Sequence, residues 1–197
     1  MAFLEQFSAE EKEMLVSLPY RAGLWVSNAD KTGSPTAEDK EVATLEKIIT
    51  DMGHGMFDSA FAHEVMAETF ARRSDWKSWA AGLETVPDTC TKAVAVIAGK
   101  LGAHDLDGYR QNIMNIGMAV AQAFREFDLN TPFPVRVFTY AKLALDRLIG
   151  KLTGQEFESN DILNVSYDED VALAKLAKSL GIDAQSVEDG AGADKKA

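Results

Sequence analysis

Carboxylate side chains gather around one predicted turn of the chain. Asp30 follows a predicted helix, and Glu38, Asp39 and Glu41 lie in the first turns of the next one. Hard cations such as Ca²⁺ need several oxygen ligands, often carboxylates together with loop carbonyls. The spacing would let Asp30 approach Glu38 or Glu41 and bind a divalent cation, with calcium the expected ion. The same acids could instead only stabilise the positive end of their own helix.

A second candidate site combines Asp105 and Asp107 with the neighbouring His104. Oxygen and nitrogen ligands occur together there, so this segment could hold a second cation. Alternatively, one Asp caps the following helix and His104 is a surface residue.

A third candidate group contains His54, His63 and Glu64, with Asp51 three residues before His54. An Asp-x-x-His spacing places two ligands on one helical face. Ferritin-like di-metal bundles require two Glu-x-x-His motifs, and this chain has none. A helical-bundle metal enzyme is therefore an alternative interpretation only.

Established catalytic motifs are missing from the sequence. It has no Gly-rich phosphate loop, no Gly-x-Ser-x-Gly, no His-Glu-x-x-His, no Cys-x-x-Cys and no EF-hand spacing. Cys90, the single cysteine, has no nearby His or basic helix end to lower its pKa, which favours a buried, inert thiol. We therefore predict no catalytic residues and no organic cofactor.

Aromatic and basic residues form another group around Trp76 and Trp79, with Arg72 and Arg73 nearby. The two tryptophans share one side of a short helix. They either pack into the core or form a surface for a protein partner, which would make the chain an interaction scaffold without metal.

Helical periodicity extends over almost the whole chain and predicts an all-α bundle of about seven to eight helices. The expected segments are 8–28, 36–52, 59–72, 74–83, 87–101, 105–124, 135–148 and 166–180. Ser8 with Glu11 has capping-box spacing, and Thr36 is the expected N-cap of the second helix. Pro19 should kink or split the first helix, leaving a gap for Tyr20 or Arg21.

The domain organisation follows from the same pattern. We expect one helical domain over 1–182, which could consist of related halves 1–86 and 87–182. The polar segment 183–197 should form a disordered tail.

One arrangement occurs twice: an apolar helix, an Asp and Gly turn, and another helix. The first copy contains Trp25 to Asp30, Gly33, Glu38 and Glu41; the second, degenerate copy contains Val94 to Leu101, Asp105, Asp107 and Gly108. This arrangement resembles the tellurite-resistance TerB-like family of helical proteins, mainly over 11–49. The resemblance implies a stress-associated, non-enzymatic module with a divalent-cation site.

The sequence also departs from the family pattern. Lys31 and Thr32 separate Asp30 from the Gly that the family usually places next to it. Gln111 and Asn112 stand where the Glu of the second copy is expected.

Charge and composition restrict the partners. The net charge is −11, which disfavours binding to a phosphate backbone, so we expect no nucleic acid. No segment approaches the roughly 20 apolar residues of a membrane span, and the N-terminal residues lack signal-peptide features. The expected location is the cytoplasm, and a protein partner is expected.

Overall fold

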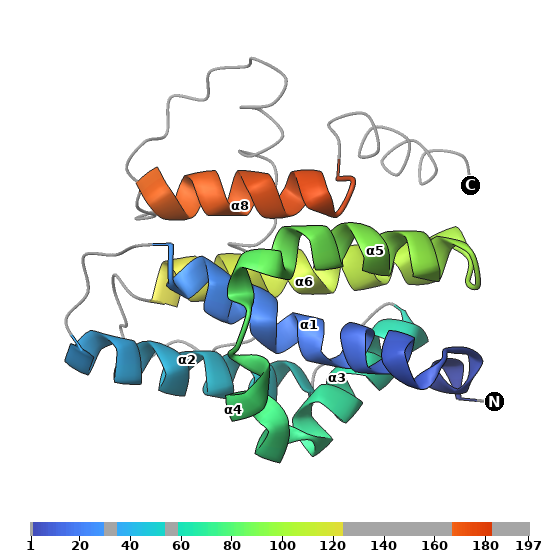
Figure 1. The fold of residues 1–197 in the computed structure, drawn as a ribbon, viewed down its shortest axis with the longest axis horizontal. Coiled ribbons are helices and arrows are strands. Elements are labelled where there is room, and N and C mark those ends of the chain that lie inside the picture. Colours follow the sequence, from blue (N-terminus) through green and yellow to red (C-terminus); the bar gives the residue numbers. More distant parts are fainter. Residues whose placement is uncertain (1, 30–34, 54–58, 124–166, 183–197) are drawn as a thin grey trace, which may run out of the picture.

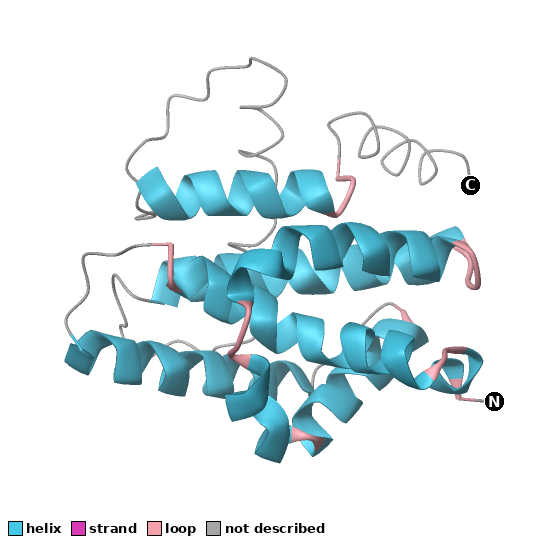
Figure 2. Cartoon of the chain, in the orientation of Figure 1, coloured by secondary structure: helices cyan, strands magenta, loops and turns pink. Residues whose placement is uncertain are grey.

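The protein is a bundle of helices in the computed structural model, which describes residues 2–29, 35–53, 59–123 and 167–182. These residues form seven α-helices and three short 3-10 helices, and the described part contains no strand (Figures 1 and 2). This confirms the predicted all-α fold. The expected helix 135–148 and the tail 183–197 lie outside the described residues.

The helices follow one another with short connections. The first elements are η1 (Phe3–Gln6), α1 (Ala9–Ser27), α2 (Pro35–Gly53), α3 (Ala60–Ala71), η2 (Arg73–Asp75) and α4 (Trp76–Trp79). The later ones are η3 (Leu83–Thr85), α5 (Val86–Ala98), α6 (Ala103–Ala123) and α8 (Tyr167–Ser179). None of the helices in the described ranges has both the length and the apolar character needed to cross a bilayer.

Several helix ends follow their local sequence signals. Ser8 Oγ accepts from Glu11 N at 3.2 Å, and Glu11 Oε2 accepts from Ser8 N at 2.7 Å, which is the predicted capping box. Ser59 Oγ accepts from Ala62 N and caps α3. Gly181 ends α8 in the left-handed region, with φ +66°.

Three boundaries differ from the prediction. Helix α2 begins at Pro35 rather than after Thr36, because the fixed φ of proline suits a first helical turn. The segment 74–83 is not one short helix, since a left-handed Gly82 separates α4 from η3. Helix α6 begins at Ala103 rather than at 105, so Asp107 and Gly108 of the second motif copy lie well inside the helix.

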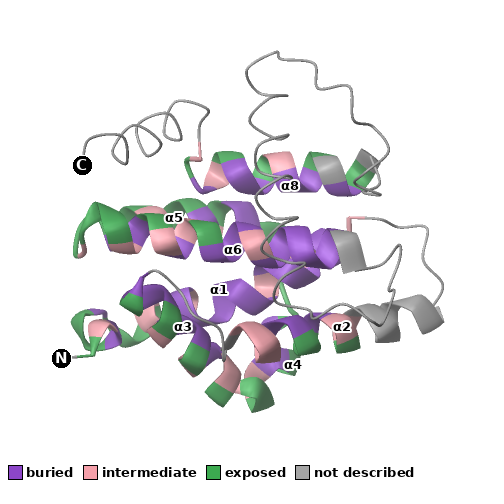
Figure 3. Ribbon diagram, turned by 180° about the vertical axis from the view of Figure 1, so that it is seen from behind, coloured by how far each residue is buried: buried purple, intermediate pink, exposed green. Residues whose placement is uncertain are grey.

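Helix α1 occupies the centre of the bundle, and α2, α3, α5, α6 and α8 all pack against it. Buried residues from Leu4 to Leu180 form one hydrophobic cluster in the described part of the chain. Figure 3 shows the buried positions on the sides of the helices that face one another, with exposed positions on their outer sides. Because the cluster includes residues from both predicted halves, α1 and α6 share a single core.

Close helix packing depends on two glycines. A Cβ on Gly23 of α1 would lie 2.4 Å from Leu45 Cδ1. A Cβ on Gly117 of α6 would lie 3.0 Å from Leu176 Cδ2. The missing side chains leave room for Leu45 beside α1 and for Leu176 beside α6, and the ends of these leucine side chains would have to shift to accommodate an alanine.

Pro19 lies within α1 without splitting it into two helices. Proline has no N–H, so the Leu15 carbonyl four residues earlier loses its helical donor. The hydroxyl of Tyr109, a fully buried residue of α6, donates to that carbonyl at 3.0 Å. The gap is therefore filled by another helix, and not by Tyr20 or Arg21 as the sequence suggested.

Tyr20 and Arg21 have other partners. The Tyr20 ring stacks on Trp76, with 4.9 Å between the ring centroids. Arg21 Nη2 donates to the carbonyl of Gly82 at 2.8 Å and to Thr85 Oγ1 at 3.0 Å. Tyr20 thereby joins α1 to α4, and Arg21 joins α1 to the segment between α4 and α5.

Candidate functional site

At the junction of α1 and α2, the structure describes the backbone positions of Glu38, Asp39 and Glu41. Helix α1 ends at Ser27 and α2 begins at Pro35, so Glu38 and Glu41 lie in the first two turns of α2. Residues three apart share one helical face. Asp30 and the side chains of Glu38, Asp39 and Glu41 lie outside the described residues.

The second candidate group is divided between different partners. Asp105 Oδ1 accepts from Ser59 Oγ at 3.0 Å, and Asp107 Oδ1 pairs with Arg110 Nη1 at 3.1 Å. Both carboxylates belong to α6, where residues two apart do not face each other. His104 is exposed and also takes part in an interaction. The structure thus gives these two carboxylates separate protein contacts rather than a shared one.

The third candidate group includes a carboxylate with a structural role. Glu64 of α3 accepts from Phe3 N at 2.7 Å and from Leu4 N at 3.0 Å. It therefore caps η1, about 60 residues away in the sequence. His63 is exposed, whereas His54 lies outside the described residues.

The tryptophan pair faces the interior. Trp76 and Trp79 are only 5% and 7% exposed. Trp76 Nε1 donates to the Thr69 carbonyl at 3.0 Å, and Trp79 Nε1 donates to Glu13 Oε1 at 2.8 Å. Of the two interpretations, core packing is the one the burial supports, because rings this buried present little area to a partner.

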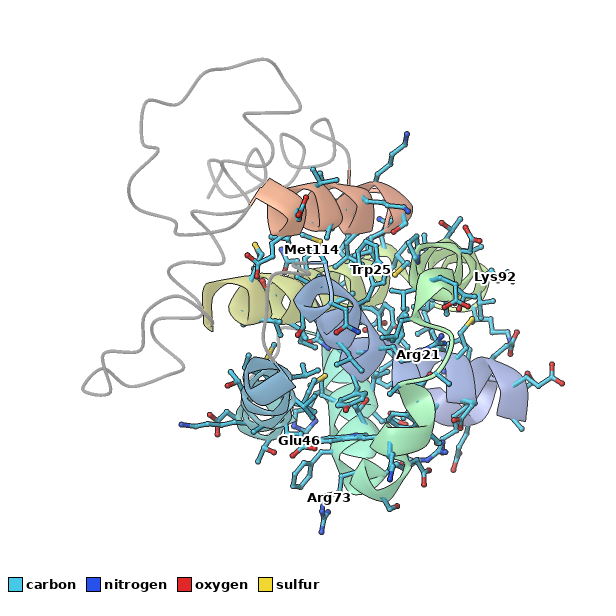
Figure 4. The ribbon with its side chains drawn as sticks, turned by 60° about the vertical axis from the view of Figure 1, so that its left-hand side comes forward. Arg21, Trp25, Glu46, Arg73, Lys92 and Met114 are labelled. Atoms are coloured by element: carbon cyan, nitrogen blue, oxygen red, sulfur yellow. The ribbon has the colours of Figure 1, made fainter. Side chains whose placement is uncertain are left out.

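The arginines beside this pair differ from each other. Arg72 Nη2 pairs with Asp75 at 2.7 Å, Arg72 Nη1 pairs with Glu13, and its guanidinium lies 5.2 Å from the Trp79 ring centroid. The hydrogen bonds that Arg72 donates to Glu13 and to Asp75 raise the pKa of its guanidinium above the usual value. Arg73 is exposed, and Figure 4 shows its side chain at the edge of the molecule.

Cys90 is fully buried in α5. Burial raises the pKa of its thiol to about 12, despite a hydrogen bond with Ser179 and the positive charge of Arg21. A thiol with so high a pKa carries almost no thiolate near neutral pH, and the thiolate is the nucleophilic form. Its position in the core agrees with the inert thiol that the sequence predicted.

Asn112 was noted in the sequence only for its place in the degenerate motif. Its side chain is 1% exposed in α6, and neither its amide oxygen nor its amide nitrogen has a hydrogen-bond partner. A buried amide without a partner is unusual in a native core. No local sequence signal could have shown this, because burial of one helix position depends on the packing of distant segments.

Among the side chains that the structure describes, which do not include those of Glu38, Asp39 and Glu41, no three from His, Cys, Asp or Glu are close enough to hold an ion. Comparisons with known proteins add no relative, since no family model, no curated protein and no solved structure matches the chain.

Proposed function

We propose that this chain is a non-enzymatic helical module that binds a divalent cation through Asp30, Glu38 and Glu41. Calcium is the expected ion. The observation that carries the proposal is the position of Glu38 and Glu41, one turn apart at the start of α2. Asp30 belongs to the connection that leads into this helix. One loop and one helix end would then supply the oxygen atoms that a hard cation requires.

The other candidate acids support this choice by their contacts. Asp105 accepts from Ser59, Asp107 pairs with Arg110, and Glu64 caps η1. Recruiting these carboxylates to an ion would break those contacts. We therefore place the cation at the α1–α2 junction and not at the start of α6 or on α3.

The acidic character of the chain is consistent with the proposal. A net charge of −11 attracts cations to the surface in general. The resemblance to TerB-like proteins suggests a stress-associated role, and this part of the proposal depends on the resemblance alone. The proposed setting in the cytoplasm, with a protein partner, is carried over from the sequence analysis.

Metal analysis followed by thermal unfolding tests the cation site. A ligand that binds only the folded state stabilises it by about 2.7 kcal/mol at 100 times its Kd. Calcium should therefore raise Tm, and a chelator should reverse the rise. Asp30→Asn and Glu41→Gln should each abolish most of the response.

Glu46→Gln is the matched control, because Glu46 is an exposed acid on the same helix. This variant should retain the calcium response. The proposal fails if calcium leaves Tm unchanged in the unsubstituted chain, or if Glu46→Gln weakens the response as much as Glu41→Gln. A stable complex in a pull-down without any ion response would instead favour the interaction scaffold.

A further inference from the structure

We draw no further inference here: the strongest candidate, the unpartnered side-chain amide of Asn112 buried on α6, is enclosed by the helices of the bundle, and nothing in the described part of the chain shows what could bind to it.

Discussion

The bond between Tyr109 and the Leu15 carbonyl can be tested by removing one hydroxyl group. Tyr109→Phe keeps the ring, which is fully buried and stacked on Phe61 at 5.8 Å, and deletes only the donor. The Leu15 carbonyl then lacks both the Tyr109 hydroxyl and the helical N–H that Pro19 cannot supply. A buried acceptor left unsatisfied costs about 1–3 kcal/mol, and we expect a loss of unfolding free energy in that range.

The Tyr109 hydroxyl can donate its hydrogen bond to the Leu15 carbonyl at both mildly acidic and mildly basic pH. Desolvation is the main cause that raises the pKa of its phenol well above the usual value of 10, and the nearby Cys90 adds to the shift. The hydroxyl therefore keeps its proton in the folded state. The cost of Tyr109→Phe should be the same at pH 6 and pH 8.

A double-mutant cycle separates this bond from general packing effects. Pro19→Ala restores an N–H at the position that would donate to Leu15 in a regular helix. If Tyr109 replaces the donor that Pro19 lacks, the loss of unfolding free energy on Tyr109→Phe should be smaller in the Pro19→Ala background. The expected difference is at least about 1 kcal/mol, the size typical of a coupled pair. Urea unfolding followed by circular dichroism gives the four free energies. Additive effects of the two substitutions would refute the reasoning.

Three further outcomes are expected from single residues. Gly108→Ala should lower the unfolding free energy by about 1–3 kcal/mol in urea unfolding, because the new Cβ would collide with Ser59 Cβ. Gly102→Ala is the control and should be close to neutral, since its Cβ would have no atom within 4 Å. Equal effects of the two would contradict the packing at Ser59. Cys90 should not react with a thiol reagent at pH 8 until urea unfolds the chain; rapid labelling of the folded protein would show that the thiol is not buried. Asn112→Leu should stabilise the chain by about 1–2 kcal/mol, since it removes an unpaired buried amide, and a lower urea midpoint would show that the amide is satisfied.

Sequence reasoning predicted the features that depend on neighbouring residues. Apolar periodicity located the helices, and the capping box followed from the hydrogen-bonding capacity of Ser8 and Glu11. Gly181 after α8 is a local feature of the same kind, because glycine adopts positive φ without steric cost. Thr36 was wrong as a helix start since Pro35, one position earlier, is also suited to the first turn.

Contacts between distant segments could not be predicted in the same way. The partners Tyr109 and Leu15 are 94 residues apart, and Glu64 is 61 residues from Phe3. In the sequence, Glu64 next to His63 suggested a pair of metal ligands. Only the packing of η1 against α3 shows that the Glu64 carboxylate accepts from backbone N–H groups instead. The acids of the α1–α2 junction remain a prediction from the sequence, together with the backbone position of Glu38 and Glu41.

Several partly exposed carboxylates are already engaged in contacts between helices, which restricts where a ligand can bind. Glu13 accepts from Trp79 and Arg72, and so joins α1 to the segment that follows α3. Asp105 accepts from Ser59 and joins α6 to the start of α3. A carboxylate engaged in this way gives up protein contacts when it binds a ligand, which lowers the net affinity it can provide. Ligand binding is therefore favoured at carboxylates whose release breaks no contact between helices.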